Sequence, residues 1–552
     1  RVSLAGGQML SAIDAAIPGD PSSAAFLVAA GILSPQGDVM VEGVMSNLTR
    51  SGFYDVANLM GAHLGAEEMG DAAGERLINI HAGSAHLSGK AVPERLVPSM
   101  IDEFPILGVM AAFADGETIV IGAEELRVKE SDRIGAVVAM LRANGVEAEE
   151  RPDGFAVQGC GGPPPGGGLV ETRHDHRIAM SALVMGTASQ KPVHVDDITM
   201  IATSYPDFLS HMAELGAEIS EGLLSADEIR WLSMRAEGGF GLTMTAAAQI
   251  DPHGIGFPGQ LGCYDDAHLP GLRELAANIN AAGSHSVVQL HHAGMRTPHE
   301  LIEGQQPVCP SDHEEFGARA MTLAEVEQAR DDFIAAAVRC EAAGFHGVEV
   351  HGAHGYLLCQ FLSAEINKRD DRYGGNLENR ARLTFEIIDG IRAACGDDFS
   401  VGLRLSPERF GMDLIEVREV ARRVMAEGQI DYLDLSLWDV FKTPVDEAYQ
   451  DRRLVDWFTD LERGEVRLGA AGKLTTGAKC REAVEAGLDF VVVGRGAILH
   501  HDFPKQVSAN PDFEPTALPV SRAHLRQEGL GESFIDYMSG WKGFVEATAA
   551  PA

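Results

Sequence analysis

Short apolar strands alternate regularly with helices from about residue 226 to the end of the chain. Strands that are apolar along their whole length and are separated by helices are typical of a parallel sheet covered by helices. This alternation predicts a parallel α/β barrel, a fold that eight strands close. We find seven candidate strands, at residues 241–244, 286–290, 347–350, 400–405, 432–435, 466–470 and 490–493.

The third candidate strand leads directly into two histidines and a tyrosine, His351, His354 and Tyr356. Strand ends are where barrels of this kind carry their chemistry. Two imidazoles close together can each donate a hydrogen bond to one carbonyl oxygen, and a nearby tyrosine can deliver a proton to carbon. A metal-binding pair and histidines satisfied in a core are the alternatives. The metal is disfavoured because no cysteine or carboxylate follows at a spacing that completes a zinc site.

Polar residues and glycines occupy other strand ends. Gln289 ends the second strand, and Arg404 lies on the fourth, where a buried guanidinium requires an anionic partner such as a reduced flavin ring. Gly472 and Gly494 follow the last two strands, where glycine lets backbone amides approach a phosphate. A tight turn is the ordinary alternative for either glycine alone.

The composition excludes several classes of partner. The chain has 552 residues, too many for one core, so we expect at least two domains. Its formal net charge of −37 argues against a nucleic-acid or membrane surface, because such partners require a positive field. Any phosphate must therefore be bound by local arginines, lysines and backbone amides.

The cysteines and the lack of targeting signals indicate a cytoplasmic protein. Seven cysteines without a Cys-x-x-Cys pair predict free thiols in a reducing compartment and no iron–sulfur cluster. We find neither a signal peptide nor an apolar run long enough to cross a bilayer. The sequence begins at Arg1 within a strand-like run, residues 2–4, so we expect its natural start to lie upstream.

Residues 1 to about 220 have a different pattern, in which strands, helices and glycine-rich turns suggest repeated βαβ-type units. Charged residues gather at three turns before helices, around Asp102, at 124–133 and at 172–177. Cations at helix starts oppose the helix dipole, which suggests that an anion is bound there with help from free amides. A salt-bridged surface is the alternative for any one of these turns.

Five motifs in this part closely resemble the C-terminal half of 5-enolpyruvylshikimate-3-phosphate (EPSP) synthase, of the bacterial glyphosate-tolerant type. They lie at residues 18–23, 99–107, 126–133, 175–181 and 196–204. The resemblance implies that Lys129, Arg133 and Arg177 bind the phosphate and carboxylate of phosphoenolpyruvate, with shikimate-3-phosphate as the second substrate. It also implies that Asp102 and Glu130 act as acid and base, a role that favours a carboxyl of raised pKa.

The second part resembles the old yellow enzyme family of FMN-dependent NAD(P)H oxidoreductases. The motifs lie at residues 235–242, 289–294, 347–357, 360–363, 372–380 and 493–495. The resemblance implies a TIM (β/α)8-type barrel with bound FMN, reduced by NADH or NADPH. The FMN contacts it implies are Ala247 and Gln289 at the ring, Arg404 near the N1/C2 carbonyl, and Gly472, Gly494 and Arg495 at the phosphate.

The same resemblance gives roles to the three residues after the third strand. His351 and His354 are expected to bind the carbonyl of an activated alkene, and Tyr356 to donate the proton. Hydride from flavin N5 would reach the β-carbon while the proton reaches the α-carbon, and the histidines would stabilise the enolate.

Both resemblances are incomplete. Members of the barrel family begin with a strand whose loop contacts the flavin, and the match here starts at the following helix, near residue 227. We therefore expect a barrel that lacks its first strand. The EPSP synthase site lies between two domains, of which one is matched, so we expect this half to be inactive alone. The domains are expected at residues 1–220 and 221–552, with no linker-like composition between them.

These observations predict an FMN-dependent ene-reductase carrying an incomplete 3-phosphoshikimate 1-carboxyvinyltransferase domain. One alternative is a bifunctional enzyme that also transfers enolpyruvyl groups; another is a chimeric or truncated product without catalysis. The expected partners are small-molecule substrates, with no nucleic acid, no membrane and no metal. Assembly of identical chains stays open.

Overall fold

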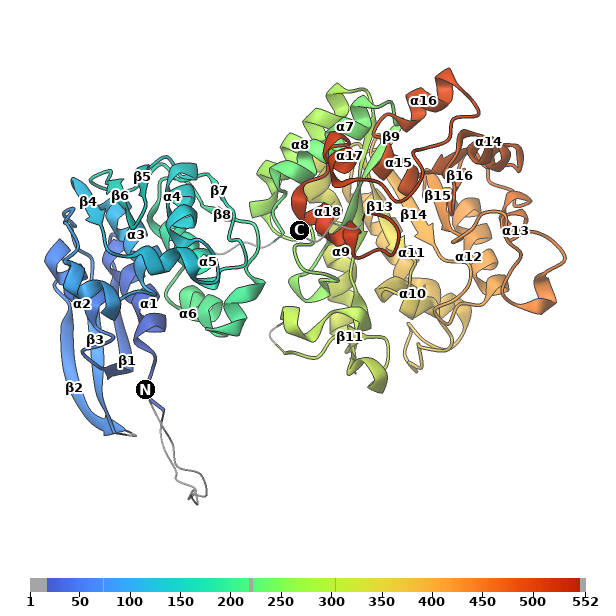
Figure 1. Ribbon diagram of the computed structural model, residues 1–552. Coiled ribbons are helices and arrows are strands. Elements are labelled where there is room, and N and C mark those ends of the chain that lie inside the picture. Colours follow the sequence, from blue (N-terminus) through green and yellow to red (C-terminus); the bar gives the residue numbers. More distant parts are fainter. Residues whose placement is uncertain (1–16, 73, 218–221, 303, 547–552) are drawn as a thin grey trace, which may run out of the picture. The chain divides into compact units, whose positions relative to one another are not determined.

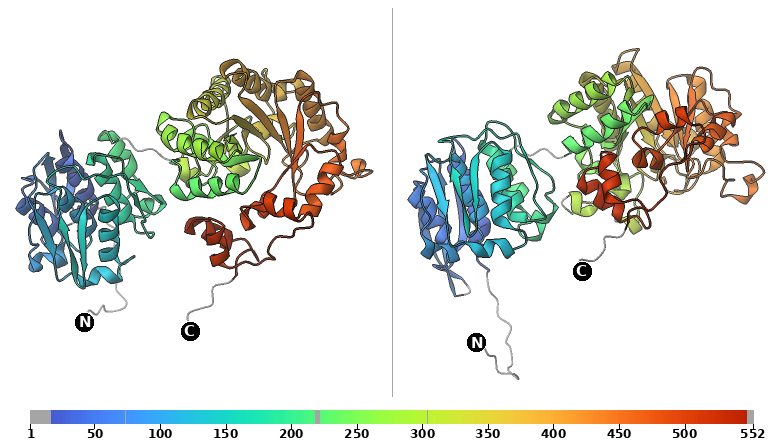
Figure 2. Two further views of the ribbon diagram at one scale, coloured as in Figure 1. Left: turned by 90° about the horizontal axis from the view of Figure 1, so that it is seen from above. Right: turned by 45° about the horizontal axis from the view of Figure 1, so that its top comes forward.

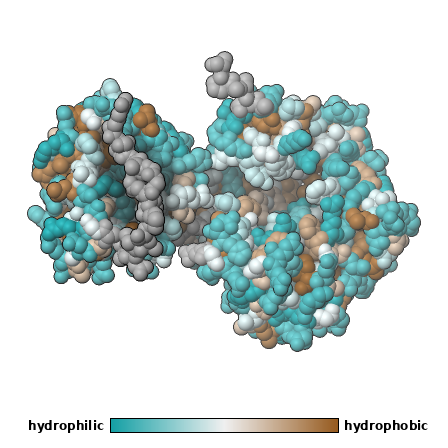
Figure 3. Space-filling model, turned by 60° about the horizontal axis from the view of Figure 1, so that its bottom comes forward, coloured by the Kyte–Doolittle hydropathy of each residue, from teal (hydrophilic) through white to brown (hydrophobic). Residues whose placement is uncertain are grey.

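The computed structural model describes residues 17–72, 74–217, 222–302 and 304–546, so the strand expected at residues 2–4 lies outside the described residues. The chain forms two compact units, Arg1–Ile219 and Ser220–Ala552 (Figure 1). The surface in view in Figure 3 is mainly hydrophilic, in keeping with 81 acidic and 44 basic residues. No helix in the described ranges is long and apolar enough to cross a membrane.

The first unit repeats one arrangement of strands. Its elements are β1 Asp38–Ser46, α2 Gly52–Met60, β2 Gly65–Ala72, β3 Glu75–Gly83, β4 Glu117–Val120, α4 Arg133–Ala143, β5 Glu147–Arg151, β6 Gly154–Gln158, β7 Leu169–Val170, α5 His176–Ala188 and β8 His194–Val195. Two sheets have the orders β1-β3-β2 and β4-β6-β5, each with its middle strand antiparallel to both neighbours. The outer strands of each sheet are therefore parallel and joined by a helix, with a hairpin strand inserted between them. The predicted βαβ-type units are thus present in split form, and β7-α5-β8 is an unsplit one.

Aspartate side chains cap three helices in the described part of this unit. Asp20 accepts a hydrogen bond from the Ser23 backbone at 2.9 Å and starts α1 (Pro21–Leu33), and Asp132 does the same for α4 through Gly135 at 3.2 Å. The central helix, α3 (Phe104–Phe113), is apolar all round and every one of its residues is buried. The last helix of the unit is α6 (Phe208–Glu214).

The second unit contains a curled sheet of seven strands, each parallel to its neighbours (Figures 1 and 2). All seven predicted strands are present, in the order β17-β16-β15-β14-β13-β10-β9. Val348 and Val350 of β13 pack into the core beneath the helices, so the alternate residues Glu349 and His351 face the inside of the curl. The strands are β9 Leu242–Gln249, β10 His285–His291, β13 Gly347–Gly352, β14 Ser400–Leu405, β15 Tyr432–Ser436, β16 Arg467–Ala471 and β17 Phe490–Val492, with the short pair β11 Val308–Cys309 and β12 Arg319–Ala320 in a loop.

Helices between successive strands cover the outer face of this sheet because the connections between parallel strands are crossovers, and further helices follow β17. The helices are α7 Ala226–Glu237, α8 Leu269–Ala281, α9 Leu323–Ala343, α10 Leu357–Leu362, α11 Leu377–Ala394, α12 Leu414–Glu427, α13 Asp456–Thr459, α14 Gly477–Glu485, α15 Arg495–Leu499, α16 Phe503–Ala509, α17 Arg522–Gln527 and α18 Glu532–Ser539.

Within the described residues β9 and β17 are the two edges of the sheet, so no eighth strand joins them there. Instead, α7 is tied to the segment that follows β17. Arg235 Nε donates to the Ala497 carbonyl at 3.1 Å, and its Nη1 donates to the Glu528 carbonyl at 2.7 Å. The rings of Trp231 and Phe534 meet edge to face, with centroids 5.5 Å apart. These contacts hold the C-terminal helices near the opening of the sheet (Figure 2).

Candidate active site

Neighbouring strands bring four of the predicted residues to one inner face of the sheet. Ala247 of β9 lies in register with Gln289 of β10, and His351 of β13 lies in register with Arg404 of β14. Gln289 is also paired with Glu349, two residues before His351. Because the carboxyl ends of parallel strands share an edge, residues far apart in the sequence converge there.

His351, His354 and Tyr356 lie together where β13 ends. His354 Nδ1 is 3.1 Å from His351 Nε2, and the His351 and Tyr356 ring centroids are 5.3 Å apart. The Ala353 backbone N–H donates to His351 Nδ1 at 3.2 Å, so a neutral His351 carries its proton on Nε2 and donates it to His354. The proton of a neutral His354 is then on Nε2.

This arrangement differs from the expectation of two imidazoles that both donate to one carbonyl. The two rings are bonded to each other, which leaves the Nε2–H of His354 as the donor available to a ligand. A carbonyl that engages both histidines must replace the bond between them. The arrangement is local: His354 lies two residues after the end of β13, at a backbone φ of 60°.

Burial keeps these imidazoles neutral near physiological pH. It lowers the pKa of His351 well below its usual range, with further lowering by His291 and His354. Burial, Arg404 and Arg296 lower the pKa of His354 to about 4. A neutral imidazole donates one hydrogen bond but does not act as an acid. Among the three residues, Tyr356 is therefore the one suited to give up a proton.

Two further residues, for which no role was predicted, reach this cluster. The ring of His291 lies 4.3 Å from that of Tyr356, centroid to centroid, and Gln260 Nε2 lies 3.0 Å from His291 Nδ1. His291 Nε2 is buried and has no hydrogen-bond partner among the residues that the structure describes. Arg296 Nη1 donates to the His354 carbonyl at 2.5 Å, and its guanidinium lies 5.0 Å from the centre of the Tyr356 ring. The sequence shows that His291 ends a strand, which could have indicated its place in the site. The place of Arg296 depends on the path of a loop, which the sequence pattern does not show.

Arg404 meets carboxyl groups of the protein inside the curl. Its Nε donates to Ser436 Oγ at 2.8 Å and lies 3.3 Å from Asp434 Oδ2. Gln289 Nε2 donates to Glu349 Oε1 at 2.7 Å. Burial, followed by the charge of Asp434, raises the pKa of Glu349 to about 8, and burial also raises the pKa of Asp434. One guanidinium does not offset two buried carboxylates, so the pair retains a proton near neutral pH.

The residues predicted for phosphate binding lie at the ends of two adjacent strands. Gly472 follows β16 and Gly494 follows β17, and these strands pair through Ala471 and Val492. A Cβ built on Gly494 would have no heavy atom within 4 Å, so the backbone there faces open space. Arg495, the first residue of α15, is exposed.

Backbone strain is concentrated at the same end of the sheet. Left-handed backbone costs a non-glycine residue roughly 1–2 kcal/mol and tends to cluster at functional sites. Five such residues lie in the loops after β13, β14, β15 and β16. They are His354, Arg409, Phe410, Trp438 and Lys473, with φ between 50° and 65°.

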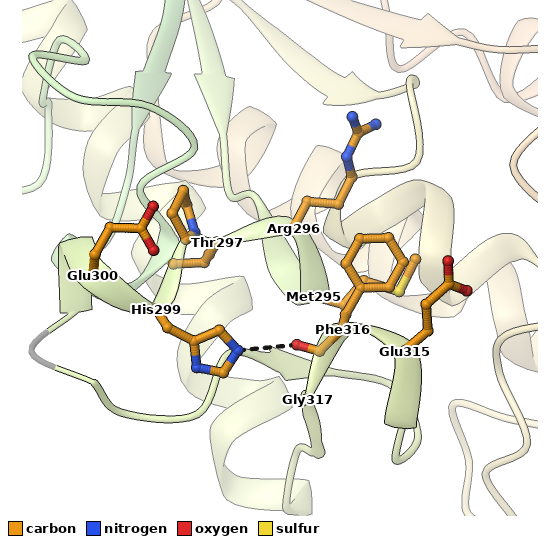
Figure 4. Close-up of a pocket in the computed structure, with 9 residues that line it drawn as sticks. Met295, Arg296, Thr297, His299, Glu300, Glu315, Phe316 and Gly317 are labelled. Atoms are coloured by element: carbon orange, nitrogen blue, oxygen red, sulfur yellow. Dashed lines mark hydrogen bonds between the residues drawn. The ribbon is translucent and has the colours of Figure 1, made fainter.

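An open cavity of about 390 Å³ lies in the loops after β10 (Figure 4). It is lined by residues 295–300, which follow β10, and by residues 315–317. His299 Nε2 lies 3.1 Å from the Phe316 carbonyl, which joins the two walls. Arg296 extends away from that bond (Figure 4), and its contacts place it against His354 and Tyr356.

In the first unit the predicted cations converge on shared carboxylates. Arg133 is fully buried and makes the closest contacts. Lys129 and Arg177 approach Asp102 at longer range. Asp175, for which no separate role was predicted, joins the cluster. The distances are 2.9 Å from Arg133 Nη1 to Asp102, 2.5 Å from its Nη2 to Glu130, 2.8 Å from its Nε to Asp175, 3.6 Å from Lys129 Nζ to Asp102 and 3.9 Å from Arg177 Nη2 to Asp102.

The expectation of a raised pKa at the acid/base carboxyl is wrong for Asp102 in this structure. Burial raises its pKa, but the charges of Arg177, Lys129 and Arg133 together outweigh burial and lower it. Burial raises the pKa of the neighbouring Glu103 instead, against a hydrogen bond from Ser22 that lowers it. Asp102 is therefore a carboxylate that partly neutralises the three cations.

Two protein families match this chain. Residues 209–512 match the NADH:flavin oxidoreductase / NADH oxidase family, and residues 1–212 match EPSP synthase (3-phosphoshikimate 1-carboxyvinyltransferase). The 3-phosphoshikimate 1-carboxyvinyltransferase of Hyphomonas neptunium is 79% identical over 219 residues, which are 40% of this chain and 50% of that protein. That of Maricaulis maris is 51% identical over 219 residues, 40% of this chain and 49% of that protein. The chain thus spans about half the length of these relatives.

Among solved structures, an old yellow enzyme homologue from Zymomonas mobilis is 26% identical to this chain, with a TM-score of 0.46. The match covers 55% of this chain and 87% of the homologue. An EPSP synthase from Acinetobacter baumannii is 38% identical, with a TM-score of 0.36, and the match covers 37% of this chain and 47% of that synthase chain.

Proposed function

Since the chain belongs to the NADH:flavin oxidoreductase / NADH oxidase family, with an EPSP synthase segment fused before it, we propose that residues 221–552 reduce activated alkenes with FMN and NADH or NADPH. The observation that carries this proposal is the cluster of His351, His354 and Tyr356 at the end of β13, beside Arg404 on the next strand. We assign the domain boundary to residues 220/221.

The residues at the strand ends fit a flavin. The Arg404 guanidinium is held at Nε by Ser436, which leaves its terminal nitrogens for the pyrimidine side of the ring. Gln289 is fixed through Nε2 on Glu349, which leaves its amide oxygen for a ring N–H. Ala247, in register with Gln289, offers a small surface to the ring. The open backbone at Gly494, with Gly472 and Arg495, suits a phosphate.

When bound, FMN supplies hydride transfer, taken from NAD(P)H and given to the β-carbon of the alkene. The protein supplies the rest. The Nε2–H of His354, and that of His351 once their mutual bond is exchanged, donate to the substrate carbonyl and stabilise the enolate oxygen. Tyr356 gives its proton to the α-carbon, and Arg296 holds the loop after β13 through the His354 carbonyl.

The test is turnover by the purified full chain loaded with FMN. We expect consumption of NADH or NADPH that depends on cyclohexenone under anaerobic conditions, with saturated cyclohexanone as product; the ratio of kcat/KM values for the two nucleotides defines the preferred reductant. A protein that carries FMN and is reduced by either nucleotide, but returns electrons to oxygen and never to an enone, would contradict the proposal.

We propose that residues 1–220 bind anions but do not transfer enolpyruvyl groups on their own. Lys129, Arg133 and Arg177 would bind the phosphate and carboxylate of phosphoenolpyruvate, with Asp102 and Glu130 as acid and base when shikimate-3-phosphate and the remainder of a synthase are present. The convergence of three cations on Asp102 supports this. Because an incoming anion competes with Asp102 for these cations, phosphoenolpyruvate binding should raise the pKa of Asp102 toward its ordinary value.

Anion binding by this unit can be measured by calorimetry with phosphoenolpyruvate. Arg177→Gln should weaken binding, whereas Arg76→Gln, an exposed arginine paired with Glu68, should not. EPSP formation by the chain without any other protein would contradict the proposed lack of transfer.

A further inference from the structure

We propose that Arg296 binds a carboxylate carried by the alkene substrate, so that the enzyme prefers unsaturated carbonyl compounds with an acidic substituent. The inference rests on the proposed reductase function and adds the substrate class to it. It arises from the loop after β10, where Arg296 both lines the open cavity and contacts His354 and Tyr356.

Arg296 touches both residues that would hold and protonate the substrate. Its Nη1 donates to the backbone oxygen of His354 at 2.5 Å, and its guanidinium lies 5.0 Å from the Tyr356 ring centre. These contacts fix the guanidinium at the border between the cluster and the cavity. A ligand with its carbonyl on His354 and its α-carbon at Tyr356 therefore reaches Arg296 with a substituent.

Arg296 is exposed and forms no ion pair within the described part of the protein. A guanidinium has five N–H donors, and in the described residues Arg296 uses one hydrogen bond, to a carbonyl. Other arginines of the same unit bind a carboxylate directly, as Arg369 binds Asp371 and Arg380 binds Glu416, both at 2.5 Å. Arg296 is thus a cation with donors to spare at an active site, in a chain with a net charge of −37.

The cavity limits where an anion can sit. Glu300 and Glu315 line it together with Arg296, and their side chains extend from the two opposite walls (Figure 4). Within the described residues Arg296 bonds to the His354 carbonyl and to neither of these glutamates. A carboxylate deep in the cavity would be repelled by these groups, so its place is at the Arg296 end, next to Tyr356. A planar guanidinium can bind such a carboxylate through two parallel hydrogen bonds.

The experiment compares two ligands that differ in charge and hardly in size, 4-oxocyclohex-2-ene-1-carboxylate and its methyl ester. Their Kd values are measured from the change in flavin absorbance of the full chain loaded with FMN, without reductant. We expect Arg296→Gln to weaken binding of the acid about tenfold or more and binding of the ester less than about twofold, the scale of a hydrogen bond to a charged group. Arg296→Lys should restore part of the affinity for the acid.

Arg409→Gln is the matched control, because Arg409 is another cation in the loops at this end of the sheet, stacked on Trp438 at 4.9 Å. It should leave the difference between acid and ester unchanged. Equal effects of Arg296→Gln on both ligands, or the same loss in Arg409→Gln, would overturn the inference. So would weaker binding of NADH and NADPH without a difference between acid and ester, which would assign Arg296 to the nucleotide phosphates. A chain that retains no FMN would refute the reductase function and this inference with it, whereas the other outcomes leave the function standing.

Discussion

Replacing Glu349 by glutamine should change how the stability of the barrel unit depends on pH. Glu349 is fully buried, accepts a hydrogen bond from Gln289 at 2.7 Å and has a pKa raised to about 8 by burial and by the charge of Asp434. Glutamine keeps the shape and an oxygen for Gln289, but it has no proton to lose. The substitution therefore removes the titration and little else.

The direction follows from proton binding in the two states. The pKa of Glu349 is higher in the folded protein than in the unfolded chain, so between about pH 4.5 and 8 the folded state holds a proton that the unfolded state has lost. Stability from this group is fully present below pH 4.5, falls as the pH rises from 4.5 toward 8, and is lost above pH 8. Each pH unit in this window is worth about 1.4 kcal/mol, so from pH 5 to pH 7 the free energy of unfolding should fall by about 3 kcal/mol more in the parent protein than in Glu349→Gln.

Urea unfolding followed by tryptophan fluorescence measures this quantity in the correct unit. The 4 tryptophans, at positions 231, 438, 457 and 541, all lie in residues 220–552. Glu485→Gln serves as control, because Glu485 is exposed on α14. Equal pH slopes in the parent protein and Glu349→Gln would refute the reasoning, since they would mean that Glu349 ionises at its ordinary pH despite its burial.

Three further substitutions test separate parts of the structure. Tyr356→Phe should slow reoxidation of the reduced flavin by an enone about 100-fold and leave reduction by NAD(P)H unchanged in stopped-flow absorbance, because proton donation contributes only to the second half-reaction; equal slowing of both would assign Tyr356 to binding. Arg133→Ala should destabilise the first unit by about 3–5 kcal/mol, since it leaves the buried Asp175 unpaired, while Lys129→Ala, which loses contacts of 3.6 Å, should cost less than about 1 kcal/mol. Hydrogen exchange of residues 104–113 reports this, and equal protection in the two variants would contradict it. Arg235→Ala should release α7 from the Ala497 and Glu528 carbonyls and speed hydrogen exchange of residues 226–237 at least about tenfold. Alanine at the exposed Arg230 on the same helix should leave the exchange unchanged. Unchanged exchange in Arg235→Ala would mean that the apolar contacts of Trp231 suffice to hold α7 in place.

The strands of the barrel were predictable because each one is a local pattern. Buried parallel strands such as 400–405 are apolar runs between helices, and the structure has β14 at the same residues. The split arrangement of the first unit was not predictable in this way, since the insertion of β3 between β1 and β2 is a pairing of distant residues that the period of a strand does not encode.

The structure shows where the predicted site residues lie. His351, Arg404 and Gln289 were expected near one another because each lies at or near the end of a predicted parallel strand, whereas the register that pairs them is seen only in the structure. The hydrogen bond between His351 and His354, and the contact of Arg296 with Tyr356, depend on backbone conformations of loops. The lowered pKa of Asp102 depends on cations from three separate turns, and local charge patterns give no measure of that balance.

The most direct test of the central claim is the visible absorption spectrum of the full chain after it is mixed with FMN and the excess is removed. We expect FMN to stay bound through Gln289, Arg404 and the turns at Gly472 and Gly494, so that the protein shows a flavin absorption band. This band should bleach with NADH or NADPH and recover when an enone is added under anaerobic conditions. A colourless protein would contradict the account, because the seven strands and the contacts of α7 would then be insufficient to form the flavin site.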